Sequence, residues 1–431
     1  MNTIATIKIW DKRVGVILWD EVKNVGSFEF DRSFVALNLD ISPVHIPVAS
    51  AKNGRRVFSF PFLNFETFKG LPGFLADSLP DKFGNQMIDA WLAQQGRDLQ
   101  GFNSVDRLCY IGKRGMGALE FEPESQQQLP PSNKLEIQEL VKFASSILDD
   151  RNHFHTNLTT ENGYSDILLV GSSAGGARAK AIIAYNKITG EVRSGQIDGL
   201  EGFDYWLIKF DGVTNRQLGD PKGYGNIEYA YHLMAKAAGI EMTECELKKE
   251  HNRAHFMTKR FDRVAGEKIH MQTLCGLAHF DYNVPGAYSY EQTFQVIREL
   301  RLPYRDSEQL FKRMVFNVMV RNQDDHTKNI SFLMDKSGTW SLSPAYDVTF
   351  AYNPTNFWLK THQMSINGKR DNDTITIEDV LTVAKNNSIK KPKQLIDDIR
   401  NAVSNWNNYA IASEIEPNQA TEIQSLFNLL L

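Results

Sequence analysis

The stretch "NQDDHTKN", residues 322–329, places two carboxylates, a histidine and a lysine directly after an apolar segment. The preceding residues, "SEQLFKRMVFNVMV" at 307–320, carry Leu310, Met314 and Val318 on one stripe, which predicts a buried helix that delivers the polar loop. A turn of solvated charges would have this composition, and so would a site that holds a metal ion and moves a phosphate. The residues that follow decide between the two.

After the loop, the segments "NISFLM" and "TWSLS" flank the turn "DKSG" and predict a β-hairpin, and "SPAYDV" then places Asp347 at a strand end. Phosphoryl transfer needs oxygen ligands for Mg²⁺ and a further carboxylate that orients the attacking hydroxyl. Asp324 can be this base, with Asn329 and Asp347 as the metal ligands. Eukaryotic protein kinases share this order and the spacing from aspartate to asparagine, although their flanking residues differ.

Two structural explanations of the loop are weaker than catalysis. A calcium-binding EF-hand that starts at Asp324 is excluded, because Asn329 would occupy its glycine position and Asp335 its bidentate glutamate position. A solvated turn explains the charges but not the appearance of Asp347 after an intervening hairpin. The whole pattern therefore favours a catalytic loop.

A second candidate site lies in "LLVGSSAGGARAKAIIAYN", residues 168–186, which reads as a strand, a loop of small residues and a second strand. It is not a Walker A motif, because Ala177 stands where the lysine is required and a strand follows in place of a helix. A loop whose backbone N–H groups lie over ATP phosphates fits better. Lys180 begins the second strand, and Lys209 in "YWLIKF" could reach the phosphates, although an edge-strand lysine that prevents aggregation is an alternative for Lys209.

Length and composition set wider bounds. The 431 residues are 42% hydrophobic, which predicts two or three folded domains, and a formal net charge of −4 gives no general argument for nucleic acid as the main partner. The three cysteines are odd in number and widely spaced, which argues against disulfides and a structural zinc. With no signal-peptide pattern and no long uncharged apolar run, the expected location is the cytoplasm.

The pattern along the chain predicts four segments. Alternating residues at the start indicate a β-rich first domain at 1–124, and a polar stretch with two prolines indicates a linker at 125–134. Strands and an amphipathic helix at about 226–238 belong to a third segment, 135–261, and the remainder, 262–431, is expected to be mainly helical.

Taken together, these residues resemble the HipA-like serine/threonine kinases, which are toxins of bacterial type II toxin–antitoxin pairs. The resemblance covers nearly the whole chain and is carried by segments that occur in order: "LPGFLADSLPDKFGNQMI", "DRLCYIGKRGMGALEFEP", "SSAGGARAK", "LIKF", "NIEYAYHLMAKAAGI", "KRFDR", "NQDDHTKNISF" and "LSPAYDV". It implies an α+β, bilobal protein-kinase-like fold with an additional β-rich N-terminal subdomain, and a helical C-lobe that bears the catalytic loop.

The resemblance also implies roles for individual residues. Asp324 would be the catalytic base, and Mg²⁺ would be held by Asn329 and Asp347. ATP would be bound by the phosphate loop, the strand lysines, the hinge after "HFMT" and the catalytic segment, namely Gly175, Gly176, Lys180, Lys209, Lys259, Arg260, Phe261, His326, Asn329, Tyr346 and Asp347.

Ser173 aligns with the serine that such kinases autophosphorylate, an event that silences the enzyme, and the adjacent Ser172 leaves this position ambiguous by one residue. This chain departs from the family pattern at Arg178, where glutamine is usual, and at Lys259, where glutamate is common.

Partners are implied by the resemblance alone. Family members modify aminoacyl-tRNA synthetases and bind a small helix-turn-helix antitoxin that carries the complex to DNA. Two other functions remain open: a catalytically inactive kinase fold that acts as an antitoxin-binding corepressor, and a small-molecule kinase. The intact set of Asp324, Asn329, Asp347 and Lys209 favours an active protein kinase over the corepressor.

Overall fold

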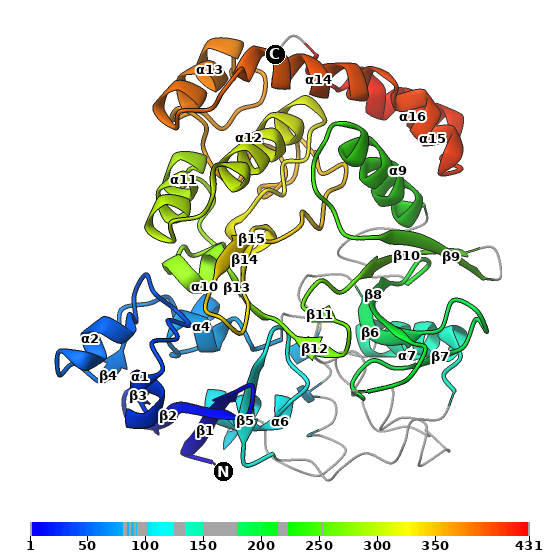
Figure 1. The fold of residues 1–431 in the computed structure, drawn as a ribbon. Helices are drawn as coiled ribbons and strands as arrows, with labels where there is room; N and C mark the ends of the chain where they lie inside the picture. Colours follow the sequence, from blue (N-terminus) through cyan, green and yellow to red (C-terminus); the bar gives the residue numbers. More distant parts are fainter. Residues whose placement is uncertain are drawn as a thin grey trace. The chain divides into compact units, whose positions relative to one another are not determined.

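The alternating residues at the start of the chain form an antiparallel five-stranded sheet in the order β4-β3-β2-β1-β5 in the computed structural model (Figure 1). The strands are β1 (Ile4–Ile9), β2 (Lys12–Asp20), β3 (Val25–Phe30), β4 (Val57–Ser59) and β5 (Leu119–Glu122). Ile7, Phe28 and Phe121 are fully buried on this sheet, because period-two alternation points every second side chain to the same face. The β-rich start is therefore confirmed.

Short helices accompany this sheet. Of these, α6 packs against β1, β2 and β5, and its Asn103 N-cap forms a capping box with Asp106. The helices are α1 (Arg32–Ala36), α2 (Val48–Lys52), α3 (Phe65–Phe68), α4 (Gly73–Ala76) and α6 (Ser104–Ile111).

The structure describes residues 2–80, 84–85, 88–89, 92, 101–124, 134–149, 179–197, 199–213, 223–250 and 253–429. The predicted linker lies almost entirely outside these residues. Within them, no helix is long and apolar enough to cross a membrane. All three cysteines are free thiols, in agreement with the predicted absence of disulfides.

A second five-stranded sheet follows in the order β7-β6-β8-β10-β9. Its core includes Ile183, Trp206, Ile208 and Met257, and residues of α7 pack into the same cluster. The elements are α7 (Ile137–Asp149), β6 (Lys180–Tyr185), β7 (Val192–Ser194), β8 (Asp204–Lys209), β9 (Cys245–Glu250) and β10 (Arg253–Lys259), and a small hairpin, β11 (Arg263–Val264) with β12 (Glu267–Lys268), comes after β10.

The chain divides into two compact units. The first unit contains both sheets and comprises Met1–Ile41, Pro47–Gly225 and Glu246–Met271, and the second unit comprises Ser42–Ile46, Asn226–Cys245 and Gln272–Leu431. This grouping places most of α9 (Tyr224–Ala237), the helix expected at 226–238, with the second unit, whereas the sequence pattern had placed it within 135–261. The four predicted segment boundaries stay a prediction.

The second unit is mainly helical. Helix α12 packs against α11 and α14, and residues 331–342 form the predicted hairpin, β14 with β15. Its elements are α9, α10 (Leu274–Ala278), α11 (Tyr290–Glu299), α12 (Tyr304–Met319), the 3-10 turn η2 (Thr327–Asn329), β14 (Ser331–Met334), β15 (Trp340–Leu342), α13 (Ile377–Asn386), α14 (Pro392–Ser404), α15 (Trp406–Ala412) and α16 (Pro417–Ser425), while β13 (His270–Thr273) spans the boundary between the units.

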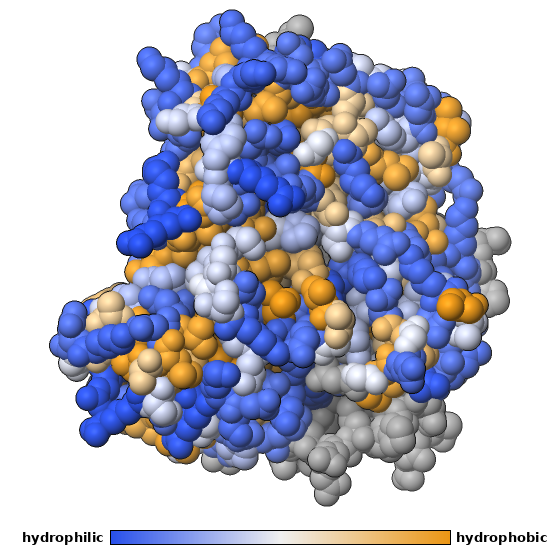
Figure 2. Space-filling model, viewed as in Figure 1, coloured by the Kyte–Doolittle hydropathy of each residue, from blue (hydrophilic) through white to orange (hydrophobic). Residues whose placement is uncertain are grey.

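The molecular face drawn in Figure 2 is largely hydrophilic, and one apolar area lies over the elements of the N-terminal sheet. Large apolar side chains that are at least half exposed in that part of the chain include Ile4, Leu18, Val57, Phe62 and Phe65. Single exposed apolar residues are common on folded proteins, so this area alone identifies no binding partner.

Candidate active site

Helix α12 directly precedes the polar loop and is buried, as its apolar stripe predicts. Leu310, Met314 and Val318 are fully buried, and the helix ends at Met319. The chain then turns through Arg321, whose positive φ of 56° prevents the helix from continuing. A backbone hydrogen bond from the N–H of Gln323 to the carbonyl of Ala351 (3.1 Å) holds the start of the loop in place.

Asp324 presents its carboxylate outward from a fixed backbone. Its side chain is 45% exposed and lies 3.9 Å from Nε2 of His326. The Asn329 amide Nδ2 donates to the backbone carbonyl of Asp324 (2.8 Å), and the Asn329 N–H donates to the carbonyl of His326 (2.9 Å). The five-residue spacing thus closes a small loop in which the asparagine fixes the position of the aspartate.

Unlike Asp324, Asp325 is buried, since its side chain is only 1% exposed. Its carboxylate accepts hydrogen bonds from the Tyr290 hydroxyl (2.8 Å) and the Gln363 N–H (2.7 Å), and it contacts Nδ1 of His362 (2.9 Å). The other ring nitrogen of His362 meets the Asn372 side-chain oxygen at 2.7 Å. This buried network holds the loop in place through the Asp325 side chain.

Electrostatics favour an ion pair between Asp325 and His362. Burial opposes the charged form of both groups, but the imidazolium and the donors around Asp325 outweigh burial and lower the pKa of this carboxyl. In the same way, the Asp325 carboxylate outweighs burial and raises the pKa of His362. Each charge is therefore stabilised by the other in the interior of the second unit.

Asp347 reaches the same region after the hairpin. It adopts a left-handed backbone conformation with φ of 55°, which aspartate tolerates better than most residues other than glycine. The preceding Tyr346 donates its hydroxyl to the carbonyl of Lys328 (2.6 Å) and also contacts the Ser331 hydroxyl. Asp347 does not lie at a strand end as predicted, because β15 ends at Leu342 and Asp347 lies in a bend after it. Its segment is nevertheless tied to the loop that carries Asn329.

A pocket in the second unit collects these groups. It is lined by Asn329, Tyr346 and Asp347 together with Tyr290, Asp325 and Arg313. Arg313 is buried on α12 and donates Nη2 to the carbonyl of Ser343, while Nε and Nη1 have no hydrogen-bond partner among the described residues. Burial lowers the pKa of Arg313 to about 10, so the guanidinium stays charged at neutral pH.

Asn329 and Asp347 have the donor chemistry for Mg²⁺. Because Nδ2 of Asn329 is committed to the carbonyl of Asp324, the orientation of its amide, and with it that of the side-chain oxygen, is fixed. Asp347 adds a carboxylate to the same pocket. Mg²⁺ is commonly held by one or two protein oxygen ligands together with substrate phosphates and waters, so this pair fits the ion.

The two candidate lysines lie side by side in the first unit. Lys180 on β6 is directly opposite Lys209 on β8 in the antiparallel register, so both side chains stand on the same face of the sheet. Lys180 is 2% exposed, and the Lys209 ammonium lies over the ring of Phe256, 5.8 Å from its centroid. Lys209 is flanked by β6 and β10, so the edge-strand alternative is excluded for it.

The predicted hinge residues at the end of β10 point in different directions. Lys259 forms an ion pair with Asp204 (2.7 Å) at the surface. The side chain of Arg260 is buried against Asp262, and its N–H donates to the carbonyl of Tyr205 (2.8 Å). Neither the side chain nor the N–H of Arg260 is therefore left for a nucleotide, and only its carbonyl could serve.

Several predicted residues lie outside the described part of the chain. These are the phosphate-loop and autophosphorylation positions, Ser172, Ser173, Gly175, Gly176 and Arg178. Among the described candidates, Asn329, Tyr346 and Asp347 come together at one pocket, and Asp324 and His326 lie on the loop that Asn329 closes.

Sequence reasoning missed the buried supports of the loop. It assigned no chemistry to Asp325, which the structure shows to be buried. It did not identify Tyr290, Arg313 or His362. The only available signal was the doubled aspartate, because the partners of Asp325 lie 35 and 37 residues away and share no local pattern with it.

Comparison with known proteins gives the family. The family model described as the HipA-like C-terminal domain matches residues 172–406, and the HipA N-terminal domain matches residues 5–122. Since the first match alone covers more than half of the chain, the protein belongs to the HipA family.

Individual relatives are more distant. A protein of Sinorhizobium fredii named as a candidate kinase, Y4mE, is 28% identical over 131 residues, and a candidate kinase of Haemophilus influenzae is 27% identical over 134 residues. Each match covers 28% of this chain, and the matched segments span only 31% and 39% of those two relatives.

The fold is known from a solved structure. HipA of Shewanella oneidensis, in a complex with HipB and its operator DNA, matches 98% of this chain and 94% of its own, with a TM-score of 0.68 and 16% identity. The likeness confirms the predicted α+β kinase-like fold with an additional β-rich N-terminal part.

Proposed function

We propose that this HipA-family chain is a serine/threonine protein kinase that transfers the γ-phosphate of ATP to a protein, and the toxin of a toxin–antitoxin pair. The observation that carries the proposal is the contrast between the outward carboxylate of Asp324 and the buried Asp325 directly beside it. One aspartate is available to a substrate, while the other holds the loop in place.

The proposed reaction forms a bond between the substrate hydroxyl oxygen and the γ-phosphorus and breaks the bond from that phosphorus to the β–γ bridging oxygen, which leaves with ADP. Asp324 would orient the hydroxyl and accept its proton. Asn329 and Asp347 would hold Mg²⁺, which neutralises phosphate charge when it is bound. Lys180 and Lys209 supply two ammonium groups on one sheet face, which suits the α- and β-phosphates.

Regulation and partners follow from family membership and belong to the same proposal. Ser173 would be phosphorylated by the kinase itself, and this modification would silence it. A small helix-turn-helix antitoxin would bind the chain, as HipB accompanies HipA in the Shewanella oneidensis complex with operator DNA. DNA would then be contacted mainly through the antitoxin, and an aminoacyl-tRNA synthetase is a candidate substrate.

The test is incubation of the protein with γ-labelled ATP and Mg²⁺, followed by phosphopeptide mass spectrometry, with Asp324→Ala as the control. We expect label on protein serine or threonine that depends on Asp324. No label on the wild type, or equal label on the control, would overturn the kinase proposal. Antitoxin binding without any label would favour the corepressor, and turnover of metabolites without labelled protein would favour a small-molecule kinase.

A further inference from the structure

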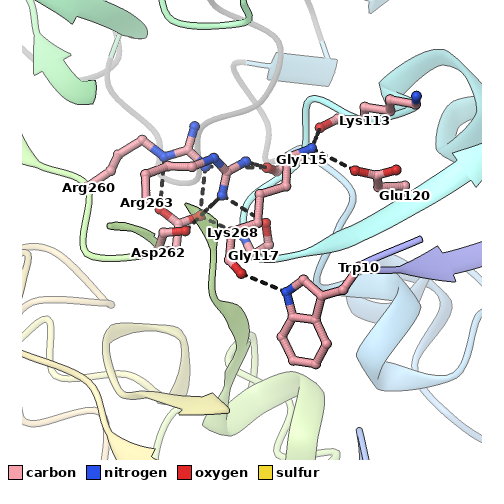
Figure 3. Close-up of polar contacts among 9 residues, drawn as sticks. All are labelled: Trp10, Lys113, Gly115, Gly117, Glu120, Arg260, Asp262, Arg263 and Lys268. Atoms are coloured by element: carbon pink, nitrogen blue, oxygen red, sulfur yellow. Dashed lines mark hydrogen bonds and ion pairs between the residues drawn. The ribbon is translucent and has the colours of Figure 1, made fainter. Parts of the chain in front are cut away.

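A buried ion cluster joins the segment after β10 to the N-terminal domain within the first unit (Figure 3). Its centre is Asp262, which is fully buried. The Asp262 carboxylate accepts from Arg260 through Nε (2.9 Å) and Nη2 (2.7 Å), from Nη1 of Arg263 (2.9 Å) and from the N–H of Gly117 (2.7 Å).

The arginines extend these contacts to the backbone of the N-terminal domain. Arg263 donates Nη1 to the carbonyl of Gly117 (2.9 Å) and Nη2 to the carbonyl of Gly115 (3.1 Å), and Arg260 donates Nη2 to the carbonyl of Gly115 (3.3 Å). The carbonyls of Gly115 and Gly117 therefore accept the hydrogen bonds of the two guanidinium groups, as Figure 3 shows. Gly117 is required here, because its φ is +75° and a Cβ would lie 3.0 Å from the backbone nitrogen of Met271.

A second line of contacts runs beside the first. The Lys268 ammonium on β12 donates to the carbonyl of Lys113 (2.8 Å) and to Oε1 of Glu120 (2.9 Å). The Trp10 indole N–H donates to the carbonyl of Lys268 (2.7 Å). Residues 260–268 are thus fixed to residues 113–120 at both ends of the segment.

The charges in this cluster favour a positioning role over a purely stabilising one. Burial alone raises the pKa of Asp262, but the guanidinium groups of Arg260 and Arg263 outweigh it and hold the pKa well below its ordinary value. Burying such an ion pair is commonly no more stabilising than a well-packed apolar group would be, whereas the charged network specifies one geometry. The residues held directly by this network are Arg260, Asp262 and Arg263.

We propose that Asp262 is a positioning residue for adenine-nucleotide binding, which it serves by fixing the hinge at residues 259–261 to Gly115 and Gly117 of the N-terminal domain. This inference depends on the proposed kinase function and on the ATP-binding role that the family resemblance implies for residues 259–261. The hinge is held on its other side by the hydrogen bond from the Arg260 N–H to Tyr205 on β8, so loss of Asp262 frees one side only.

The experiment compares three variants of the full chain. Asp262→Asn removes the central charge. Lys268→Met removes the two contacts of the ammonium group, while it keeps an apolar stem and the hydrogen bond from Trp10 to the backbone carbonyl. Lys8→Met is the matched control, because it breaks the Lys8–Glu122 ion pair (2.7 Å) between β1 and β5 without touching residues 260–268. For each variant, ATP affinity is measured by calorimetry, KM and kcat by protein labelling, and folding by circular dichroism.

We expect Asp262→Asn to raise the dissociation constant and KM for ATP by about tenfold, while kcat changes less than about twofold. The effect should stay below the roughly 100-fold that a misplacement of about 1 Å can cause, because the hydrogen bond from Arg260 to Tyr205 still holds the hinge. Lys268→Met should raise them by a smaller factor, and Lys8→Met should leave them unchanged. Hydrogen exchange without nucleotide should increase at residues 113–117 and 259–263 in Asp262→Asn.

Three results would overturn the inference. The first is an unchanged ATP affinity in folded Asp262→Asn. The second, if Asp262→Asn does not fold, is an unchanged affinity in Lys268→Met. The third is an equal loss of affinity in Lys8→Met. A wild type that binds no ATP would overturn the proposed kinase function as well, and this failure is recognised before any variant is compared.

Discussion

The carboxylate of Asp325 contacts Nδ1 of His362 at 2.9 Å in the interior of the second unit, although 37 residues separate them in sequence. Asp325 is adjacent to Asp324, whose side chain is 45% exposed. Because Asp325 is adjacent in the chain and buried, its pair with His362 holds the backbone from which the half-exposed Asp324 side chain projects. Of these two adjacent aspartates, Asp325 thus supports the loop and Asp324 is the candidate base.

This division predicts opposite effects of two neighbouring substitutions. Asp325→Asn should lower the free energy of unfolding by about 3–5 kcal/mol, because it leaves the His362 cation buried without its partner. Asp324→Asn should change it by less than about 1 kcal/mol, as expected for an exposed side chain, and should abolish phosphorylation. Denaturant unfolding and protein labelling measure the two effects. Equal losses of stability would contradict the assignment.

Asn329 is predicted to have two separable roles. Asn329→Ala removes both the candidate Mg²⁺ ligand and the donor to the Asp324 carbonyl, so the Mg²⁺ concentration for half-maximal activity should rise by at least about tenfold, the effect typical of losing a group that orients a metal site. Asn329→Asp keeps an oxygen ligand and loses only the donor. It should therefore retain most of the Mg²⁺ affinity and show a lower kcat.

The affinity for Mg²⁺ in the presence of ADP, measured by calorimetry, tests these roles without any turnover. If Asn329→Asp and Asn329→Ala lose Mg²⁺ affinity equally, Asn329 acts only through the position of Asp324. If neither loses it, the metal is held elsewhere and Asp347 becomes the residue to test next.

Much of the second unit could be predicted from local patterns. The apolar stripe at 307–320 predicts a helix, which is observed as α12. The segments around the turn "DKSG" form the predicted hairpin of β14 and β15, and the helix expected at 226–238 is α9. These elements depend on periodicity and turn residues within a few positions, which a single sequence displays directly. The order of Asp324, Asn329 and Asp347 could be found for the same reason.

The supports of the site could not be predicted, because they depend on contacts between distant segments. Asp262 meets the N–H of Gly117, 145 residues away, and Asp325 meets Tyr290 and His362. The sequence identifies "KRFDR" only as a segment that resembles the family, and it gives no sign of the contacts of this segment. Only the fold shows that its aspartate is fully buried and that its arginines are directed to backbone carbonyls.

The proposed autophosphorylation at Ser173 leads to a prediction in cells. Expression of the wild type should arrest growth, and Ser173→Ala should maintain or deepen the arrest, because the silencing modification can no longer form. Ser172→Ala is the matched control and should behave as the wild type. Loss of arrest in Ser173→Ala would mean that this serine has another role, and a phosphate mapped to Ser172 would move the site by one residue.

A buried histidine in the first unit should make stability depend on pH. The Asp211 N–H donates to Nδ1 of His255 (2.9 Å), which requires a ring that is unprotonated at this nitrogen. Burial, with a contribution from Arg253, lowers the pKa of His255 to about 4.

In the unfolded chain this histidine has an ordinary pKa near 6.5, so between the two values the unfolded state binds more protons than the folded state. Stability from the neutral ring is therefore fully present above about pH 6.5 and is lost as the pH falls toward 4.

His255→Asn is the variant that tests this, because its side-chain oxygen can accept the Asp211 N–H and it does not titrate. Between pH 7.5 and pH 4.5 the wild type should lose about 2–3 kcal/mol more unfolding free energy than the variant. Three other histidines with lowered pKa values, His232, His270 and His279, are present in both proteins and cancel in the comparison. Equal losses in wild type and variant would show that the ring of His255 is not held neutral in the fold.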